Sequence, residues 1–399
     1  MTIKPRYFSL DVFRGATVAL MILVNNPGTW DYVFSPLLHA TWHGCTATDL
    51  VFPFFLFAVG NAIAFVIPKM HEQGTSSFWL RITKRTVLIF LIGLFLNWWP
   101  FFDLKDGSLV FREWVDSSNP MYGVRILGVL QRIALAYFFA SIIAYYFRPK
   151  AIIWISTILL FAYWGLCYFL NPVDPYSLAG YFGNAIDVQI LGEAHLYRGE
   201  GVVFDPEGLM STIPSIAQVL FGYLVGLFII KNGNVDWIWP TVPKSVNNYF
   251  NTLSSLLVTG FIILVLAWTW SLVFPINKKI WTSSYVLYTT GLAILTLGTI
   301  IWYVEILKVR NWVMNFFVIF GKNPLFIYLL SSAIPSLLEV ITINTASGKV
   351  SLWNGFYEGF CAKVPGPPEL GSLVFALIFL TIMWLIGYLL DKKRIYIKV

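Results

Sequence analysis

Apolar stretches of about 20 residues recur along the chain and constrain its fold more than any other feature. A helix rises about 1.5 Å per residue, so a stretch of this length crosses the roughly 30 Å of hydrocarbon in a bilayer. A membrane β-barrel would instead show short segments of alternating polarity. With 58% hydrophobic and 12% charged residues, the 399-residue chain lies outside the usual range of soluble domains. The sequence therefore predicts an all-α polytopic membrane protein.

We predict about ten membrane-spanning helices in a single domain covering residues 1–399. The first apolar run follows Lys4, Arg6 and Arg14 and superficially resembles a signal peptide. No small-residue cleavage site follows it, and the NNPG segment at 25–28 is typical of a turn, so we interpret the run as the first span. The predicted spans are 8–24, 46–67, 82–100, 123–147, 151–170, 213–231, 254–274, 281–305, 312–341 and 371–390.

The distribution of Lys and Arg predicts the orientation of the bundle. If the N-terminus is inside, 16 of the 27 basic residues fall in inner loops, seven fall in outer loops and four lie within spans. Cytoplasmic loops carry such an excess, so we predict an N-in, C-in topology with the segment around His39 on the outer side. The same bias explains the formal charge of +7, and the expected partner is the lipid bilayer rather than a nucleic acid.

Two features of the composition concern ligands. The predicted outer loop 171–212 carries six acidic residues against Arg198 alone, which would either attract a cationic substrate or simply keep the loop soluble. The three cysteines, Cys45, Cys167 and Cys361, are an odd number without metal-like spacing. We therefore expect neither a disulfide framework nor a zinc site.

Two arginines lie on the predicted span 123–147. Arg125 and Arg132 are seven residues apart, which is two helical turns, so we expect both guanidinium groups to face the same way into the bundle. Arginines at membrane depth need anionic partners. Carboxylates of neighbouring helices and the phosphates of a bound ligand would both serve, and the sequence leaves the two open.

The GKNP segment at 321–324 lies in the middle of the predicted span 312–341. Proline removes a helix hydrogen bond, and glycine loosens the turn before it. Backbone groups freed at membrane depth are usually tolerated where they line a cavity. We predict that Lys322 and Asn323 line a ligand passage at this break, with a purely structural bend as the alternative.

A polar segment with two histidines, His39 and His43, runs directly into the second predicted span. Thr46 and Asp49 have the spacing of a capping box, which alone would explain the aspartate. The segment holding His39 can also fold back over the helix start, and an imidazole beside a carboxylate is a typical general base. We predict that His39 and Asp49 are catalytic, with His43 and Cys45 as rivals for the same role.

Four motifs resemble those of the heparan-alpha-glucosaminide N-acetyltransferase family of transmembrane acyltransferases. They occur in the family's order over about four fifths of the chain: LDVFRG at 10–15, HATWHG and TDLVFPFFLFAVG at 39–60, GVLQRIALAY at 128–137 and GKNPLFIYLLS at 321–331.

The resemblance implies an activity and places the family's histidine on His39 and its aspartate on Asp49. The implied reaction moves an acetyl group from cytosolic acetyl-CoA across the bilayer to the amine of a glucosamine residue on the far side. His43 stands where the lysosomal enzymes carry asparagine, and their extra N-terminal lumenal region is lacking. The resemblance is thus to a bacterial member in the inner membrane, with a free or cell-wall-derived amino sugar as acceptor.

These lines combine into one mechanistic hypothesis. Acetyl-CoA docks from the basic inner side, and His39 takes the amine proton while Asp49 orients the imidazole. Direct attack and an acetyl-histidine intermediate are both open. A secondary transporter of amino sugars and an O-acyltransferase are the rival functions, and an apolar outer surface would permit a homodimer. The predicted acetyl-CoA contacts are Arg125, Arg132, Lys322 and Asn323.

Overall fold

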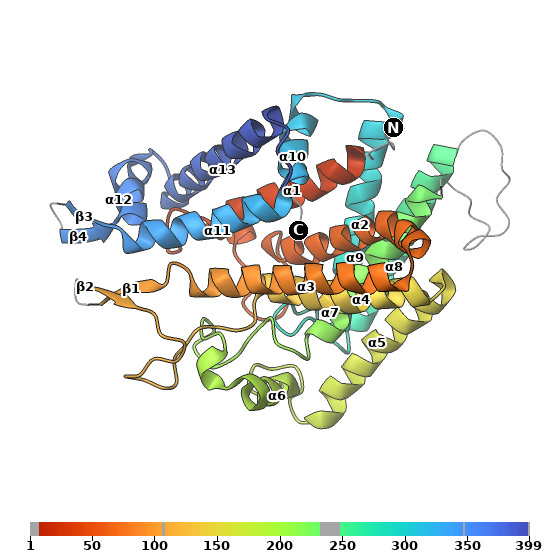
Figure 1. Cartoon of the computed structure of the whole chain (residues 1–399), viewed down its shortest axis with the longest axis horizontal. Coiled ribbons are helices and arrows are strands. Elements are labelled where there is room, and N and C mark those ends of the chain that lie inside the picture. The colour runs from red at the N-terminus through yellow and green to blue at the C-terminus, as the bar shows by residue number, and fades with distance from the viewer. Residues whose placement is uncertain (1–7, 106–107, 232–247, 346–347, 398–399) are drawn as a thin grey trace.

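The computed structural model describes residues 8–105, 108–231, 248–345 and 348–397, which form a bundle of helices with two small hairpins at one end (Figure 1). The long helices are α1 (Phe8–Asn25), α2 (Val51–Gln73), α3 (Thr75–Trp98), α4 (Val129–Tyr146), α5 (Pro149–Leu170), α7 (Thr212–Ile230), α8 (Asn248–Ser271), α9 (Ser283–Ile301), α11 (Pro324–Val340) and α13 (Pro368–Lys392). The shorter elements are α6 (Phe182–Leu191), α10 (Trp312–Lys322), α12 (Leu352–Gly359), β1 (Phe102–Lys105), β2 (Ser108–Phe111), β3 (Thr342–Thr345) and β4 (Gly348–Ser351).

The predicted spans coincide with helices of the structure. In the part of the chain that the structure describes, eight helices are long and apolar enough to cross a membrane, and α10 with α11 would make a ninth span. The helix α3 corresponds to the remaining predicted span and is less apolar, since Arg81, Lys84 and Arg85 lie in its first half. The predicted all-α polytopic membrane fold is confirmed, whereas the N-in, C-in topology stays a prediction.

One predicted span begins later than the sequence suggested. The helix α4 starts only at Val129, so Arg125 lies on a non-helical segment before it. The side-chain amide of Asn97, on α3, donates to the carbonyl oxygen of Arg125 (2.9 Å) and to that of residue 127 (3.1 Å). Because these backbone groups bond outside a helix, the expectation that Arg125 and Arg132 share one helical face is wrong.

The predicted break in the span 312–341 is confirmed. The helix α10 ends at Lys322, α11 begins at Pro324, and their axes differ by 82°. Proline cannot donate to the preceding turn, so the helix hydrogen-bond ladder stops at the residue where the GKNP pattern placed the break.

The most extensive contact between two described helices joins α2 and α7. A β-carbon at Gly60 of α2 would lie 2.0 Å from the carbonyl oxygen of Val219. One at Gly222 of α7 would lie 2.2 Å from the carbonyl oxygen of Phe57. Small residues at such a crossing let the backbones of two membrane helices approach closely. The two glycines therefore set the distance between α2 and α7.

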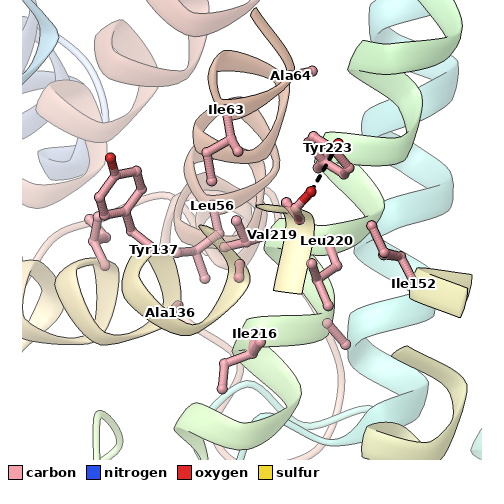
Figure 2. Packing of buried hydrophobic residues seen from close by; sticks show 14 of the residues in the cluster. Leu56, Ile63, Ala64, Ala136, Tyr137, Ile152, Ile216, Val219, Leu220 and Tyr223 are labelled. Carbon is pink, nitrogen blue, oxygen red and sulfur yellow. Dashed lines mark hydrogen bonds between the residues drawn. The ribbon is translucent and has the colours of Figure 1, made fainter. Parts of the chain in front are cut away.

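Apolar side chains from α2, α4, α5 and α7 pack around this crossing (Figure 2). Leu56 and Val219 are fully buried there, and the hydroxyl group of Tyr223 donates to the carbonyl oxygen of Ala144 on α4 (3.4 Å). This core fixes α2 relative to α4 and α7, and the segments that lead into these three helices carry the site described below.

Short elements occupy regions that were predicted as loops. The antiparallel hairpins β1–β2 and β3–β4 follow α3 and α11 and lie at the same end of the long axis of the molecule (left in Figure 1). The predicted outer loops 171–212 and 342–370 contain α6 and α12. The prediction of long connections was confirmed, but not their internal structure, because segments of four to ten residues carry little periodicity.

We expect Gly222→Ala to lower the thermal unfolding midpoint of the detergent-purified protein by several degrees. The added methyl group would overpack the crossing, and overpacking costs about 1–3 kcal/mol. The matched control is Gly165→Ala on α5, where the nearest atom to a new β-carbon would be 3.9 Å away, in the side chain of Phe169. Thermal melts in which Gly222→Ala is as stable as the control would contradict the close crossing.

Candidate active site

The irregular segment between α1 and α2 folds back over the start of α2. The backbone N–H of Gly44 donates to the carbonyl oxygen of Ile276 (2.8 Å), and the indole N–H of Trp42 donates to that of Tyr176 (2.8 Å). These bonds hold the segment against the loops before α6 and α9. His39 consequently lies against the first turn of α2, as its position in the sequence predicted.

Asp49 is the centre of the site. It lies in the 3₁₀ turn Thr48–Leu50 that leads into α2, and its side chain is only 1% exposed. Its Oδ1 is 2.6 Å from Nδ1 of His39. Its Oδ2 accepts from the backbone N–H groups of Ala40 and Thr46, both at 3.0 Å. It also lies 3.1 Å from the Thr46 hydroxyl oxygen, whose single hydrogen has a shorter contact (2.6 Å) with the carbonyl oxygen of Leu38. The predicted capping box is half formed, because Asp49 caps the Thr46 N–H but no side chain caps the turn.

These bonds fix the protonation pattern of the pair. A carboxyl group that accepts two backbone N–H donors on one oxygen is stabilised in its ionised form, and an ionised carboxylate can only accept. Nδ1 of His39 therefore carries the proton of the 2.6 Å bond, and Nε2 of the neutral ring keeps its lone pair. The His39 side chain is 44% exposed, so a ligand can reach Nε2.

A cavity of about 170 Å³ opens beside His39. Its wall combines residues of α1, α2, α4 and α11 with four residues that lie outside these helices, His39, Thr48, Glu207 and Lys278. The hydroxyl group of Thr48 is buried in this wall and has no hydrogen-bond partner among the described residues. The remaining lining residues are Met21, Asn25, Val51, Phe52, Phe55, Val129, Ile133 and Tyr328.

Lys278 completes the charged part of the site. Its Nζ lies 3.0 Å from Nδ1 and 3.3 Å from Nε2 of His39, and 3.5 Å from Oδ1 of Asp49. Burial lowers the pKa of Lys278 below the ordinary lysine value, although the carboxylates of Asp49 and Glu207 oppose this shift.

Glu207 is held in the cavity wall by Arg125. The guanidinium group donates to Asp205 (2.6 and 2.9 Å) and to Glu207 (2.5 Å). Burial opposes the charge on Arg125, but the two carboxylates raise its pKa above the ordinary arginine value. Burial likewise opposes the charge on Glu207, and Arg125, Arg132 and Lys278 together lower its pKa. These shifts favour the ionised forms of both Arg125 and Glu207.

Arg132 is fully buried behind the cavity wall. Its Nη2 donates to the carbonyl oxygens of Pro206 (2.7 Å) and Gly208 (3.3 Å) and to the hydroxyl of Ser211, and its guanidinium lies 4.9 Å from the centre of a Trp281 ring. Its Nε and Nη1 have no hydrogen-bond partner in the described part of the chain. Arg125 and Arg132 thus both brace the segment before α7.

Lys322 and Asn323, the other predicted acetyl-CoA contacts, bind the end of the chain. Nζ of Lys322 lies 2.7 Å from both carboxylate oxygens of Asp391. The Asn323 side chain donates to the carbonyl oxygen of Ile395 (3.0 Å) and accepts from the N–H of Ile397 (2.8 Å). The residues that line the 170 Å³ cavity include neither these two nor the two arginines, so their contact with acetyl-CoA stays a prediction.

The two rivals of His39 lie nearby but are differently placed. Nδ1 of His43 is 3.4 Å from the side-chain amide of Asn277, and burial lowers the pKa of His43. Burial and the neighbouring Asp49 raise the pKa of the Cys45 thiol to about 12. A thiol that stays protonated is a poor nucleophile, and neither rival lines the cavity.

Thr48, Glu207 and Lys278 line the cavity but were not among the predicted site residues. In the sequence, Glu207 was only one of the acidic residues of a loop, and Lys278 was one of the basic residues of an outer loop. Only their place along the chain could have indicated these residues. Each lies near the start of a predicted helix or a few residues before it, on the predicted outer side with His39.

Fold and site together define a polytopic membrane protein with a histidine–aspartate pair at the mouth of a cavity between its helices. The sequence model of the family described as "Heparan-alpha-glucosaminide N-acetyltransferase, catalytic" matches residues 6–256, and the chain belongs to this family. The resemblance seen in the four motifs is thereby confirmed.

Two relatives are similar over most of this chain. It is 27% identical to the heparan-alpha-glucosaminide N-acetyltransferase of Homo sapiens over an alignment 385 positions long, which covers 82% of this chain and 52% of that protein. It is 26% identical to the protein of the same name from Mus musculus over an alignment 441 positions long, which covers 98% of this chain and 60% of that protein. The chain therefore spans only part of the length of the curated relatives it matches.

We expect Arg125→Met to destabilise the protein strongly, because it leaves the buried carboxylates of Asp205 and Glu207 without their cation. Removing one partner of a buried pair costs about 3–5 kcal/mol. The matched control is Arg112→Met, since Arg112 pairs with Asp103 where both side chains are about one-third exposed (32% and 37%). Such surface pairs contribute about 0–1 kcal/mol. Equal unfolding midpoints for the two variants would refute the structural role of Arg125.

Proposed function

We propose that the chain is a transmembrane N-acetyltransferase that moves the acetyl group of acetyl-CoA to the amine of a glucosamine-type amino sugar. The observation that carries this proposal is the 2.6 Å bond between Asp49 and Nδ1 of His39, which leaves Nε2 beside the cavity. The family match and the names of the two relatives support the reaction class.

His39 acts as the general base in this proposal. A neutral amine becomes positively charged as its nitrogen attacks a thioester, and Nε2 takes the proton that the nitrogen must lose. Asp49 holds the ring in the tautomer that leaves Nε2 unprotonated, and its negative charge stabilises the imidazolium that forms.

The cavity suits the acetyl end of the donor. Its 170 Å³ is below the roughly 300–1,000 Å³ of pockets that enclose drug-sized ligands, so the bulk of the coenzyme would lie outside it. The Thr48 hydroxyl, which has no partner among the residues that the structure describes, can donate to the thioester oxygen, where negative charge develops. We also propose that acetyl-CoA contacts four residues outside the cavity, Arg125, Arg132, Lys322 and Asn323. The affinity of the alanine variant of each residue for acetyl-CoA tests this proposal.

The orientation in the membrane is part of the proposal. The excess of basic residues in the predicted inner loops places His39 on the outer side, opposite to cytosolic acetyl-CoA. We expect inside-out vesicles to acetylate the sugar when acetyl-CoA is supplied externally. Right-side-out vesicles should not do so under the same conditions. We propose a bacterial inner membrane as the location, on the resemblance to bacterial members of the family.

We expect His39→Ala to reduce the acetyl-CoA-dependent acetylation of glucosamine by about 10²–10⁴-fold, the range typical of a lost general base. Asp49→Asn should also reduce the turnover number, because the amide cannot stabilise the imidazolium. Mass spectrometry of the product of the purified protein measures both. The matched control is His43→Ala, which should keep activity within a few-fold of the wild type. Wild-type turnover by His39→Ala, or its loss in His43→Ala, would contradict the assignment.

The same preparation separates the rival functions. Uptake of unmodified sugar by proteoliposomes without acetyl-CoA would favour a transporter, which the break between α10 and α11 would also suit. A product labile to mild base would be an ester and would favour an O-acyltransferase. Persistent label on His39 after incubation with labelled acetyl-CoA alone is expected only for an acetyl-histidine route.

A further inference from the structure

Lys278 occupies a position that base catalysis by His39 does not require. It comes from the segment between α8 and α9, 239 residues from His39 in sequence, and its side chain is 20% exposed. It lines the cavity, and its Nζ lies within 3.0–3.3 Å of both nitrogens of the His39 ring.

The contacts of Lys278 differ from those of an ordinary ion pair. Lys322 shows the ordinary case, because its Nζ is 2.7 Å from both oxygens of Asp391. Nζ of Lys278 is instead 3.5 Å from the nearer oxygen of Asp49, and closer to the imidazole. Asp49 already accepts from His39 and from the backbone N–H groups of Ala40 and Thr46, so it does not depend on the lysine for its hydrogen bonds.

The charged and titratable groups that face Lys278 bear on its protonation. They are the imidazole of His39, the carboxylates of Asp49 and Glu207 and the thiol of Cys45. Burial outweighs the attraction of the acidic groups and lowers the pKa of Lys278, so its ammonium is a stronger acid than that of a solvated lysine. In the neutral ring only the Nε2 lone pair can accept its proton, at 3.3 Å.

We propose that Lys278 is the general acid of the reaction and gives its proton to the sulfur atom that leaves the acetyl group, an inference that rests on the proposed acetyl transfer. Two positive charges about 3 Å apart repel each other, so proton uptake by His39 favours proton release from Lys278. The base and the acid are thereby coupled through one short contact.

The proposed step balances in atoms and charge. The amine nitrogen forms a bond to the carbonyl carbon, the carbon–sulfur bond breaks, and its electron pair stays on sulfur. Nε2 of His39 accepts the amine proton, and Nζ of Lys278 donates a proton to the sulfur. The imidazolium then returns a proton to the neutral lysine across the Nε2–Nζ contact of 3.3 Å. Amine and thioester become amide and thiol, and both side chains regain their starting states.

The test compares Lys278→Met and Lys278→Arg with the wild type, in full-length purified protein supplied with acetyl-CoA and glucosamine. Arginine keeps the positive charge but is too weak an acid to give up its proton. We expect both variants to lose at least about 10²-fold in kcat, with a smaller change in the KM for acetyl-CoA. The kcat of the wild type should fall at alkaline pH as Lys278 deprotonates. This alkaline limb of the pH profile should be absent from both variants over the accessible pH range.

The matched control is Lys279→Met. Nζ of Lys279 donates to the carbonyl oxygen of Thr41 (2.8 Å) and pairs with Glu200, so this variant loosens the same loop without removing the proposed acid. We expect it to keep the alkaline limb of the wild type. If the kcat of Lys278→Arg is within about threefold of the wild-type value, the role of Lys278 is purely electrostatic, and the proposal is overturned.

A measurement without acetyl-CoA gives an independent readout. The protein is labelled competitively with isotopic acetic anhydride, and mass spectrometry measures the labelling of each lysine as a function of pH. We expect the pH midpoint for Lys278 to lie below that of a free lysine side chain. A midpoint at or above the free value, or no labelling at pH values where free lysine reacts fully, would overturn the proposal. If wild-type protein forms no acetylated sugar while Lys278 titrates low, the proposed function fails, and the acid assignment fails with it.

Discussion

The buried carboxylate of Asp49 determines how the site is arranged. An ionised group with 1% exposure is costly unless donors surround it. The donors come from the segment between α1 and α2, through the N–H groups of Ala40 and Thr46 and the imidazole of His39. Satisfying the aspartate therefore forces the segment to fold back. The same contacts that make burial tolerable orient the proposed base.

The charged residues of the site share a position in the chain. Asp49, Arg125, Glu207 and Lys278 each lie shortly before the first residue of a helix, namely α2, α4, α7 and α9. The glycine crossing of α2 and α7 brings two of these helix starts together, and the buried network of Arg125 fixes the segment before α7. The helices supply a rigid apolar frame, and the polar chemistry lies on the short segments that lead into them.

Local sequence patterns predicted the features that local physics determines. The ten apolar runs indicated the helices, and proline and glycine at 321–324 indicated the break between α10 and α11. The approach of His39 to Asp49 was predictable because only ten residues separate them and both flank a helix start. The carboxylate partners of Arg125 remained an open alternative in the sequence, and the structure places Asp205 and Glu207 there.

Features set by distant partners were not predictable from one sequence. The helix α4 begins late because Asn97, about 30 residues earlier, binds the carbonyl groups that a longer helix would have used. Apolar residues continue through this segment, so periodicity alone could not show the boundary. Lys278 lies 239 residues from His39, and no local pattern connects the two. Their contact follows from the packing of α9 and its preceding segment beside α2.

Base catalysis by His39 requires that Asp49 hold the neutral imidazole with Nε2 unprotonated and open to the cavity. Nitrogen-15 NMR of histidine-labelled protein reads this tautomer, because the two ring nitrogens of each tautomer have different shifts and the His39 signals can be assigned by their loss in His39→Ala. We expect a protonated Nδ1 and a bare Nε2 for the neutral His39 ring, with this preference lost in Asp49→Asn. A neutral ring protonated on Nε2 in the wild type would contradict the proposed role of the pair.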